Sequence, residues 1–114
     1  MSSADHNWGK IAAEIGNGAA DKLRSYIEDP NTAAEMVRVN KGGRTPITVV
    51  NDYIARHLPH LRLSQGVRSR VGTVVRDVLW EHGLIPSGGQ DRIKGPCYLS
   101  SGALYMERPT AKVA

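Results

Sequence analysis

Residues 64–85, SQGVRSRVGTVVRDVLWEHGLI, carry the clearest helical period in this chain of 114 residues. Ser64 is suited to cap the start, and Gly83 can adopt the left-handed conformation that ends a helix. The pattern predicts an amphipathic helix over residues 64–82 with an arginine-bearing outer face. Its inner face consists of six aliphatic residues: Val67, Val71, Val74, Val75, Val78 and Leu79. Its outer face consists of five polar residues: Ser69, Arg70, Thr73, Arg76 and Asp77.

The first third of the chain also has helical spacing. It predicts a short helix over residues 7–16 and a second over residues 19–29, which stops at Pro30. Residues 31–39 fit either another helical turn or a strand. We favour a short strand over residues 36–39.

A glycine-rich loop at residues 40–44 is followed by a strong helix start. Thr45 predicts an N-cap, and Pro46 suits the first helical position, where its missing N–H has no intrahelical partner to lose. This helix is expected to end before Pro59. A connection of about six residues, 58–63, then leads into the helix of residues 64–82.

The end of the chain has strand-like segments instead of helical ones. Residues 97–99 and 103–107 predict two strands joined by a tight turn. Alternatively, residues 84–85 form the first arm of a longer hairpin. Either arrangement gives a small β-hairpin, followed by a tail at residues 109–114 that is expected to fray.

The net charge of +4 is unevenly distributed. Residues 1–35 hold three basic and six acidic side chains, and residues 77–114 hold four of each. Residues 36–76 hold eight bases and one acid, Asp52, which is typical of a surface that faces a polyanion. Solvation of these bases, or pairing with the acidic first third, is the alternative. The eight bases are Arg38, Lys41, Arg44, Arg56, Arg62, Arg68, Arg70 and Arg76.

This order of elements resembles the winged helix-turn-helix superfamily of DNA-binding domains. The resemblance covers residues 33–108 of a single domain, 1–114, whose residues 1–32 add N-terminal helices. It rests on Thr45-Pro46, on the valine stripe of the helix described first, and on the exit WEHGLI at residues 80–85. The implied fold is mainly α with a small β-hairpin. The implied function is that of a small transcriptional regulator that binds double-stranded DNA, in a sequence-specific or an architectural manner.

The resemblance implies a set of DNA-binding residues. The helix at 64–82 would lie in the major groove, with Ser69, Arg70 and Thr73 at base edges. Arg68 and Arg76 would contact phosphates or bases, and Arg56 and Arg62 the flanking backbone. Arg92 and Lys94 would reach DNA from the wing. Trp80, near the polar face, is expected to stack on the wing, to form a dimer surface or to pack in the core.

Two other functions fit the same sequence. A protein-binding adaptor or inhibitor would use the basic helical face against an acidic protein partner, although serine, threonine and arginine suit a DNA groove better. RNA binding is a third interpretation. The sequence shows no exposed aromatic pair with basic neighbours on a strand, which RNA binding would favour.

The sequence does not indicate an enzyme. It contains no nucleophile, carboxylate-pair or nucleotide-loop motif, and no cofactor is expected. His57 and His60 lack a third ligand for a metal, and the lone Cys97 is expected to be a packing residue. No segment is apolar enough to span a bilayer. A cytoplasmic protein, associated with the nucleoid if it binds DNA, is the expectation.

Overall fold

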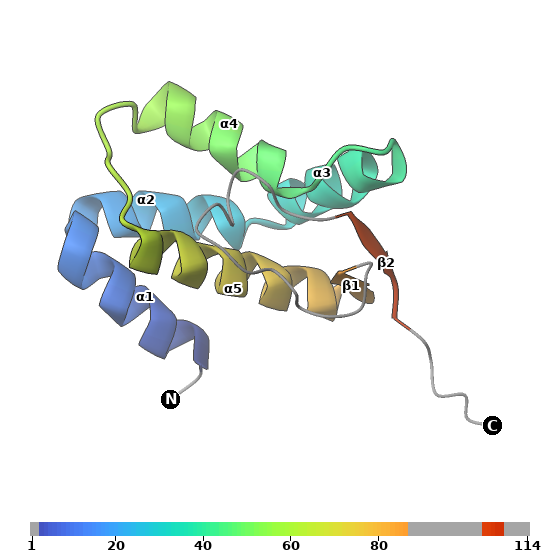
Figure 1. Cartoon of the computed structure of the whole chain (residues 1–114), viewed down its shortest axis with the longest axis horizontal. Coiled ribbons are helices and arrows are strands. Elements are labelled where there is room, and N and C mark those ends of the chain that lie inside the picture. The colour runs from blue at the N-terminus through green and yellow to red at the C-terminus, as the bar shows by residue number, and fades with distance from the viewer. Residues whose placement is uncertain (1–2, 87–103, 109–114) are drawn as a thin grey trace.

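The structure is a computed structural model, and it describes residues 3–86 and 104–108 (Figure 1). The fold is mainly α-helical with a small two-stranded antiparallel sheet, as the sequence predicts. None of the helices in these residues is both long enough and apolar enough to cross a membrane. The elements in chain order are α1 (Ser3–Ile15), α2 (Asn17–Ile27), α3 (Pro30–Lys41), α4 (Ile47–His57), α5 (Gln65–Glu81), β1 (Leu84–Pro86) and β2 (Tyr105–Glu107).

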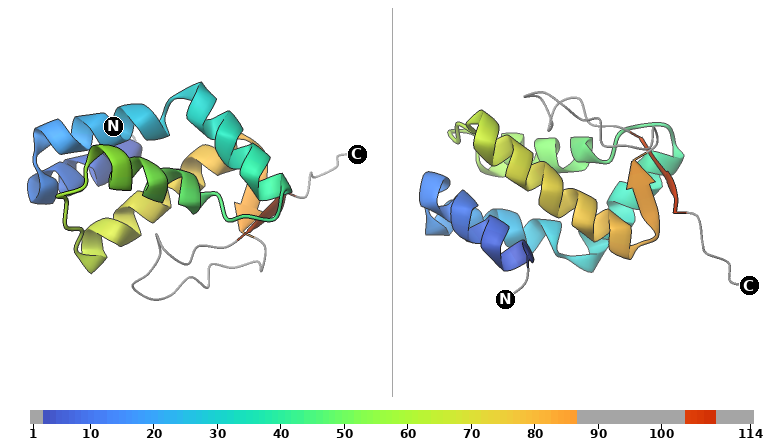
Figure 2. Two further views of the ribbon diagram at one scale, coloured as in Figure 1. Left: turned by 90° about the horizontal axis from the view of Figure 1, so that it is seen from above. Right: turned by 60° about the horizontal axis from the view of Figure 1, so that its bottom comes forward.

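The long helix α5 lies at the centre of the fold. It packs against α1 and α3 and leads directly into β1, while α4 packs on α3 (Figures 1 and 2). Every helix contributes to one hydrophobic core, which includes the fully buried Ile11, Leu23 and Met36. The buried residues of α5 are Val67, Val71, Gly72, Val74, Val75 and Leu79, so the predicted apolar face is confirmed, and Val78 is partly buried beside it.

Both ends of α5 are fixed as the sequence predicts. At the start, the Ser64 hydroxyl accepts a hydrogen bond from the Val67 N–H at 3.1 Å. The same hydroxyl donates to the Glu14 carboxylate at 2.7 Å, which ties the end of α1 to the start of α5. At the other end, Gly83 has a φ of 83°, in the left-handed region that favours glycine.

The first two helices start earlier than expected, at Ser3 and Asn17. Between them Gly16 has a φ of 92°, which breaks what would otherwise be a continuous helix and lets α2 fold back on α1 (Figure 2). The expected break between two helices is therefore confirmed, but it lies at Gly16 and not at residues 17–18.

The predicted strand at residues 36–39 is wrong, because these residues belong to α3. Asp29 caps this helix by accepting a hydrogen bond from the Asn31 N–H at 2.8 Å, and Pro30 occupies its first turn. Pro30 therefore starts a helix in addition to following the end of α2. Met36 and Val39 are three residues apart and both buried, so burial of one helical face outweighs the strand propensity of Met-Val-Arg-Val.

The expected cap of α4 is also wrong in its detail. Pro46, and not Thr45, precedes the first helical residue, and no side chain caps this end. The carbonyl of Thr45 instead accepts from the Thr48 N–H at 3.1 Å and from the Thr48 hydroxyl at 2.7 Å. The buried Pro46 holds the turn in place against the core.

The hairpin uses residues 84–86 as its first arm, which confirms the first arm expected for the longer alternative, and pairs them with residues 105–107. Strand β2 begins at Tyr105 and pairs with β1 in the register Leu84 to Glu107. The strand expected at residues 97–99 and the tail at 109–114 lie outside the described residues.

A side chain completes the outer edge of this hairpin. Asn40, near the end of α3, donates through Nδ2 to the Tyr105 carbonyl at 2.9 Å and accepts through Oδ1 from the Tyr105 N–H at 2.7 Å. Both backbone groups of Tyr105 therefore point away from its β1 partner, Pro86. Proline lacks an N–H, and this register requires none from it.

We expect Ser64→Ala to lower the free energy of unfolding by about 1 kcal/mol, because it removes the cap of α5. Urea denaturation would measure the change. Ser25→Ala, at an exposed site inside α2, is the matched control and should change stability by less than about 0.5 kcal/mol. Equal effects of the two substitutions would contradict the capping role.

We expect Asn40→Ala to destabilise the protein by about 1–2 kcal/mol and to speed hydrogen exchange at the Tyr105 amide, since it removes both hydrogen bonds to that residue. Asn31→Ala, an exposed site on the same helix, serves as the control. If the Tyr105 amide exchanged at its original rate in Asn40→Ala, the edge contact would not hold the hairpin.

Candidate nucleic-acid interface

Helix α5 presents a polar strip to solvent, opposite its valine face. Ser69 is exposed, Thr73 and Arg76 are partly exposed, and Trp80 retains 50% of its accessible surface. These four residues follow one another at spacings of four, three and four, which places them on one side of the helix. The Thr73 hydroxyl donates to the Ser69 carbonyl at 3.0 Å and so keeps its oxygen lone pairs for another donor.

Arg62 and Arg68 share one cleft. Both line a cleft of about 730 Å³ between α4 and the start of α5. Arg62 comes from the connection at residues 58–64 and is exposed, whereas Arg68 comes from the first turn of α5 and is partly buried. Because Ser64 fixes the first turn of α5, it also fixes the backbone from which Arg68 extends. The remaining residues of the cleft are Asn51, Ile54, Pro59, His60, Leu61 and Leu63.

Arg70 is directed elsewhere. Its Nη1 donates to the Asn7 side-chain oxygen at 3.0 Å, across the contact between α5 and α1. The guanidinium is partly buried there. The structure therefore separates Arg70 from Ser69 and Thr73, the residues with which the sequence groups it.

Arg56 lies on another side of α4. It lines a smaller cleft of about 310 Å³, which also contains Arg44 and the two carboxylates Glu35 and Asp52. Two tyrosines form its aromatic part, since Tyr26 and Tyr53 stack with ring centroids 4.0 Å apart. This second cleft has mixed charge, and Arg56 does not extend the surface formed by Arg62 and Arg68.

Ion pairing involves few of the bases in residues 36–76. Arg38 pairs with Glu35 at 2.5 Å, and this contact lowers the pKa of the Glu35 carboxyl. Arg62, Arg68 and Arg76 have no carboxylate within ion-pair distance among the residues that the structure describes. Internal pairing with the acidic first third therefore accounts for one of the eight bases, and not for the others.

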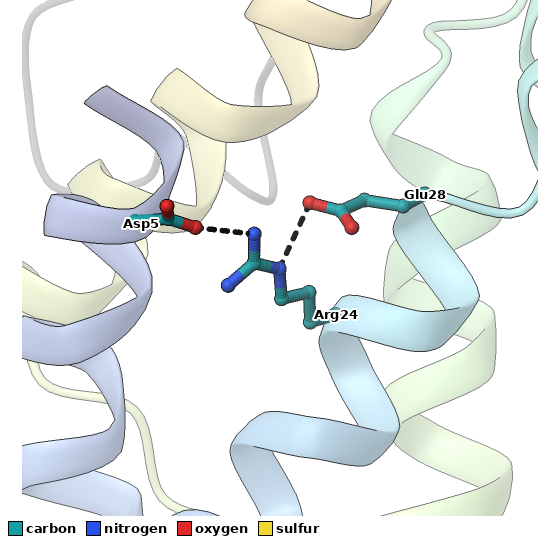
Figure 3. Close-up of polar contacts among 3 residues, drawn as sticks. All are labelled: Asp5, Arg24 and Glu28. Atoms are coloured by element: carbon teal, nitrogen blue, oxygen red, sulfur yellow. Dashed lines mark hydrogen bonds and ion pairs between the residues drawn. The ribbon is translucent and has the colours of Figure 1, made fainter. Parts of the chain in front are cut away.

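Two acids of the first third pair with an arginine of the same segment (Figure 3). Arg24, on α2, contacts Asp5 of α1 at 2.8 Å and Glu28 at 3.0 Å. The hydrogen bond with Asp5 is the main reason that the pKa of Arg24 is raised, with Glu28 contributing further. This exposed ion pair links α1 to α2 and includes none of the bases of residues 36–76.

The C-terminal half of α5 has an acidic side. Asp77 and Glu81 line a groove of about 480 Å³ with Glu28 and apolar residues of α2 and α3. Desolvation raises the pKa of the Asp77 carboxyl, and Glu81 adds to that shift while Arg76 opposes it.

Trp80 contacts the residue that follows the hairpin. The guanidinium of Arg108 lies over the Trp80 ring, 4.1 Å from its centroid. Arg108 directly follows β2, and its N–H donates to the Gly83 carbonyl at 2.7 Å. This cation–π pair was missed in the sequence because 27 residues separate its members and no short-range pattern connects them.

Arg92, Lys94 and Cys97 lie outside the described residues. The His57 ring packs against the Tyr53 ring with centroids 4.7 Å apart, and His60 lines the larger cleft. Across residues 3–86 and 104–108, no three side chains of the metal-binding types come together.

Comparison with known proteins adds no family to this description. No protein-family model, no curated protein and no solved structure matches the chain.

We expect Arg70→Ala to reduce the free energy of unfolding by about 1 kcal/mol, because the substitution removes the hydrogen bond between α5 and α1. Lys22→Ala, an exposed base on α2, should change stability by less than about 0.5 kcal/mol. Chemical denaturation of the two variants beside the wild type provides the measurement. An unchanged stability of Arg70→Ala would mean that its guanidinium is available to a partner instead.

Proposed function

We propose that this protein binds double-stranded DNA as a winged helix-turn-helix domain, with α5 in the major groove. In this proposal α4 and α5 form the helix-turn-helix unit, and β1 and β2 form the base of the wing. The element order from α3 onward supports it. No strand precedes α4, but Asn40 occupies the outer edge of β2, where such a strand would pair.

One observation carries the proposal. Arg76 shares an outward strip with Ser69 and Thr73, and Arg62 and Arg68 line the cleft between α4 and the start of α5 without a carboxylate partner among the described residues. Short hydroxyl side chains allow close approach to base edges, while arginine binds guanine or phosphate through paired donors. The distribution of residues thus suits a groove that has a polyanionic border.

Each side chain has a definite role in this arrangement. Ser69 and Thr73 read base edges, Arg76 contacts a base or the adjacent phosphate, and Arg62 and Arg68 bind the backbone on the α4 side. Asp77 and Glu81 lie on the other side of α5 and would repel phosphate there. The DNA backbone is therefore expected to pass on the side of α4, and not on the side of α1 and α2.

A second function is favoured by exposed apolar residues on α5 and β2. Trp80 is half exposed, and Met106 on β2 retains 45% of its accessible surface. Exposed tryptophan, methionine and arginine side chains are enriched at protein interfaces. An acidic protein surface that contacts the same strip is therefore the competing proposal, with RNA as a third partner class.

Arg62→Ala and Arg76→Ala should each weaken binding to mixed-sequence duplex DNA by about threefold to tenfold, because each removes one phosphate or base contact. Each should also reduce the slope of the logarithm of the binding constant against the logarithm of the salt concentration by about one. Fluorescence anisotropy with labelled duplex, titrated across salt concentrations, measures both quantities.

Arg56→Ala is the matched control, since Arg56 belongs to the same basic segment but lies in a different cleft. It should change the affinity by less than about twofold. Equal losses in Arg56→Ala and Arg76→Ala would contradict the assigned face. Absence of duplex binding at low salt would reject the proposal, and parallel titrations with RNA and with an acidic protein would separate the remaining classes.

A further inference from the structure

The cleft that contains Arg62 and Arg68 has features that DNA binding does not require. Its volume of about 730 Å³ falls in the range of small-molecule sites in proteins. One wall comes from the connection between α4 and α5, and the other walls come from α4 and from the first turn of α5. Phosphate contacts need only exposed basic side chains, so a cleft that combines two arginines with apolar side chains calls for a separate explanation.

The charge of this cleft is of a single sign. Among the residues that the structure describes, the ionisable ones that line it are Arg62, Arg68 and His60, and none of the lining residues is a carboxylate. The two other clefts described above differ, because one contains Glu35 and Asp52 beside its bases and the other contains three carboxylates. Two guanidinium groups within one cleft attract an anion and can hold its oxygens through paired hydrogen bonds.

Apolar side chains line the same cleft as the two arginines. Ile54 and Leu63 pack against the hydrophobic core with one side and line the cleft with the other. Leu61 lines the cleft as well, is only partly buried, and does not belong to the core cluster. An apolar ligand body would cover these three side chains and remove their surface from water.

The walls are held in place before any ligand arrives. The Leu61 N–H donates to the Leu58 carbonyl at 3.0 Å, which closes a turn in the connecting segment. At the far end of that segment, Ser64 is bonded to both Val67 and Glu14. A segment fixed at both ends loses little conformational entropy when a ligand binds, so the cleft is organised for binding.

We propose that this cleft binds a small organic anion with an apolar body, with its phosphate or other acidic group between Arg62 and Arg68 and its body against Ile54, Leu61 and Leu63. The site does not depend on the proposed DNA binding. If both are correct, the ligand and DNA compete for the same two arginines, and the small molecule acts as an effector of DNA binding.

The reporter for the test is 8-anilinonaphthalene-1-sulfonate, an aromatic anion whose fluorescence rises in apolar surroundings. Arg62→Ala and Arg68→Ala should each weaken its binding by about tenfold, since each removes a charge-assisted hydrogen bond. Arg44→Ala and Arg76→Ala remove arginines that do not line this cleft and should leave the affinity within about twofold. Phenyl phosphate should displace the reporter at lower concentration than either phenol or inorganic phosphate.

A second measurement locates the site independently of the variants. On addition of phenyl phosphate, backbone amide NMR signals of residues 61–63 and 68 should shift, while those of residues 77–82 in the acidic groove should not. Shifts confined to other regions, or unchanged reporter affinity in both arginine variants, would overturn the inference. Reporter binding without duplex binding would reject only the proposed function, and duplex binding without reporter binding would reject only this inference.

Discussion

The burial of the valine face of α5 is the interaction on which the rest of the structure depends. Four valines, together with Gly72 and Leu79, meet side chains from α1, α3 and β1 around most of the inner circumference of the helix. Valine has few rotamers and lowers intrinsic helix propensity, so α5 gains most of its stability from this packing. The helix is consequently well ordered only when its neighbours are in place, and the polar strip on its other side has a defined position for the same reason.

The elements of this core could be predicted where the sequence repeats with a helical period. The faces of α5, the cap at Ser64 and the stop at Gly83 all follow from local spacing and from residue chemistry. The prediction for residues 36–39 was wrong because two valines in a four-residue stretch contain no information about the helix that begins six residues earlier at Pro30. Tertiary burial of Met36 and Val39 decided that segment.

The candidate site shows the same division between local and distant information. Local sequence correctly placed Ser69, Thr73 and Arg76 on one face, because helix geometry alone determines that grouping. It could not indicate that Arg70 would bind Asn7, 63 residues away, or that Arg56 and Arg62 would line different clefts. These outcomes depend on how α1 and α4 pack around α5, and a single sequence gives little information about such packing.

The two sides of α5 carry opposite charge. Unpaired guanidinium groups gather toward α4, and carboxylates gather in the groove between α5, α2 and α3, so positive and negative charge are displaced from each other across the short dimension of a helix. Such a separation creates an electric dipole that a net charge of +4 does not describe. In the field of any polyanion the molecule would rotate before contact, and a larger share of its collisions would occur with the basic side leading.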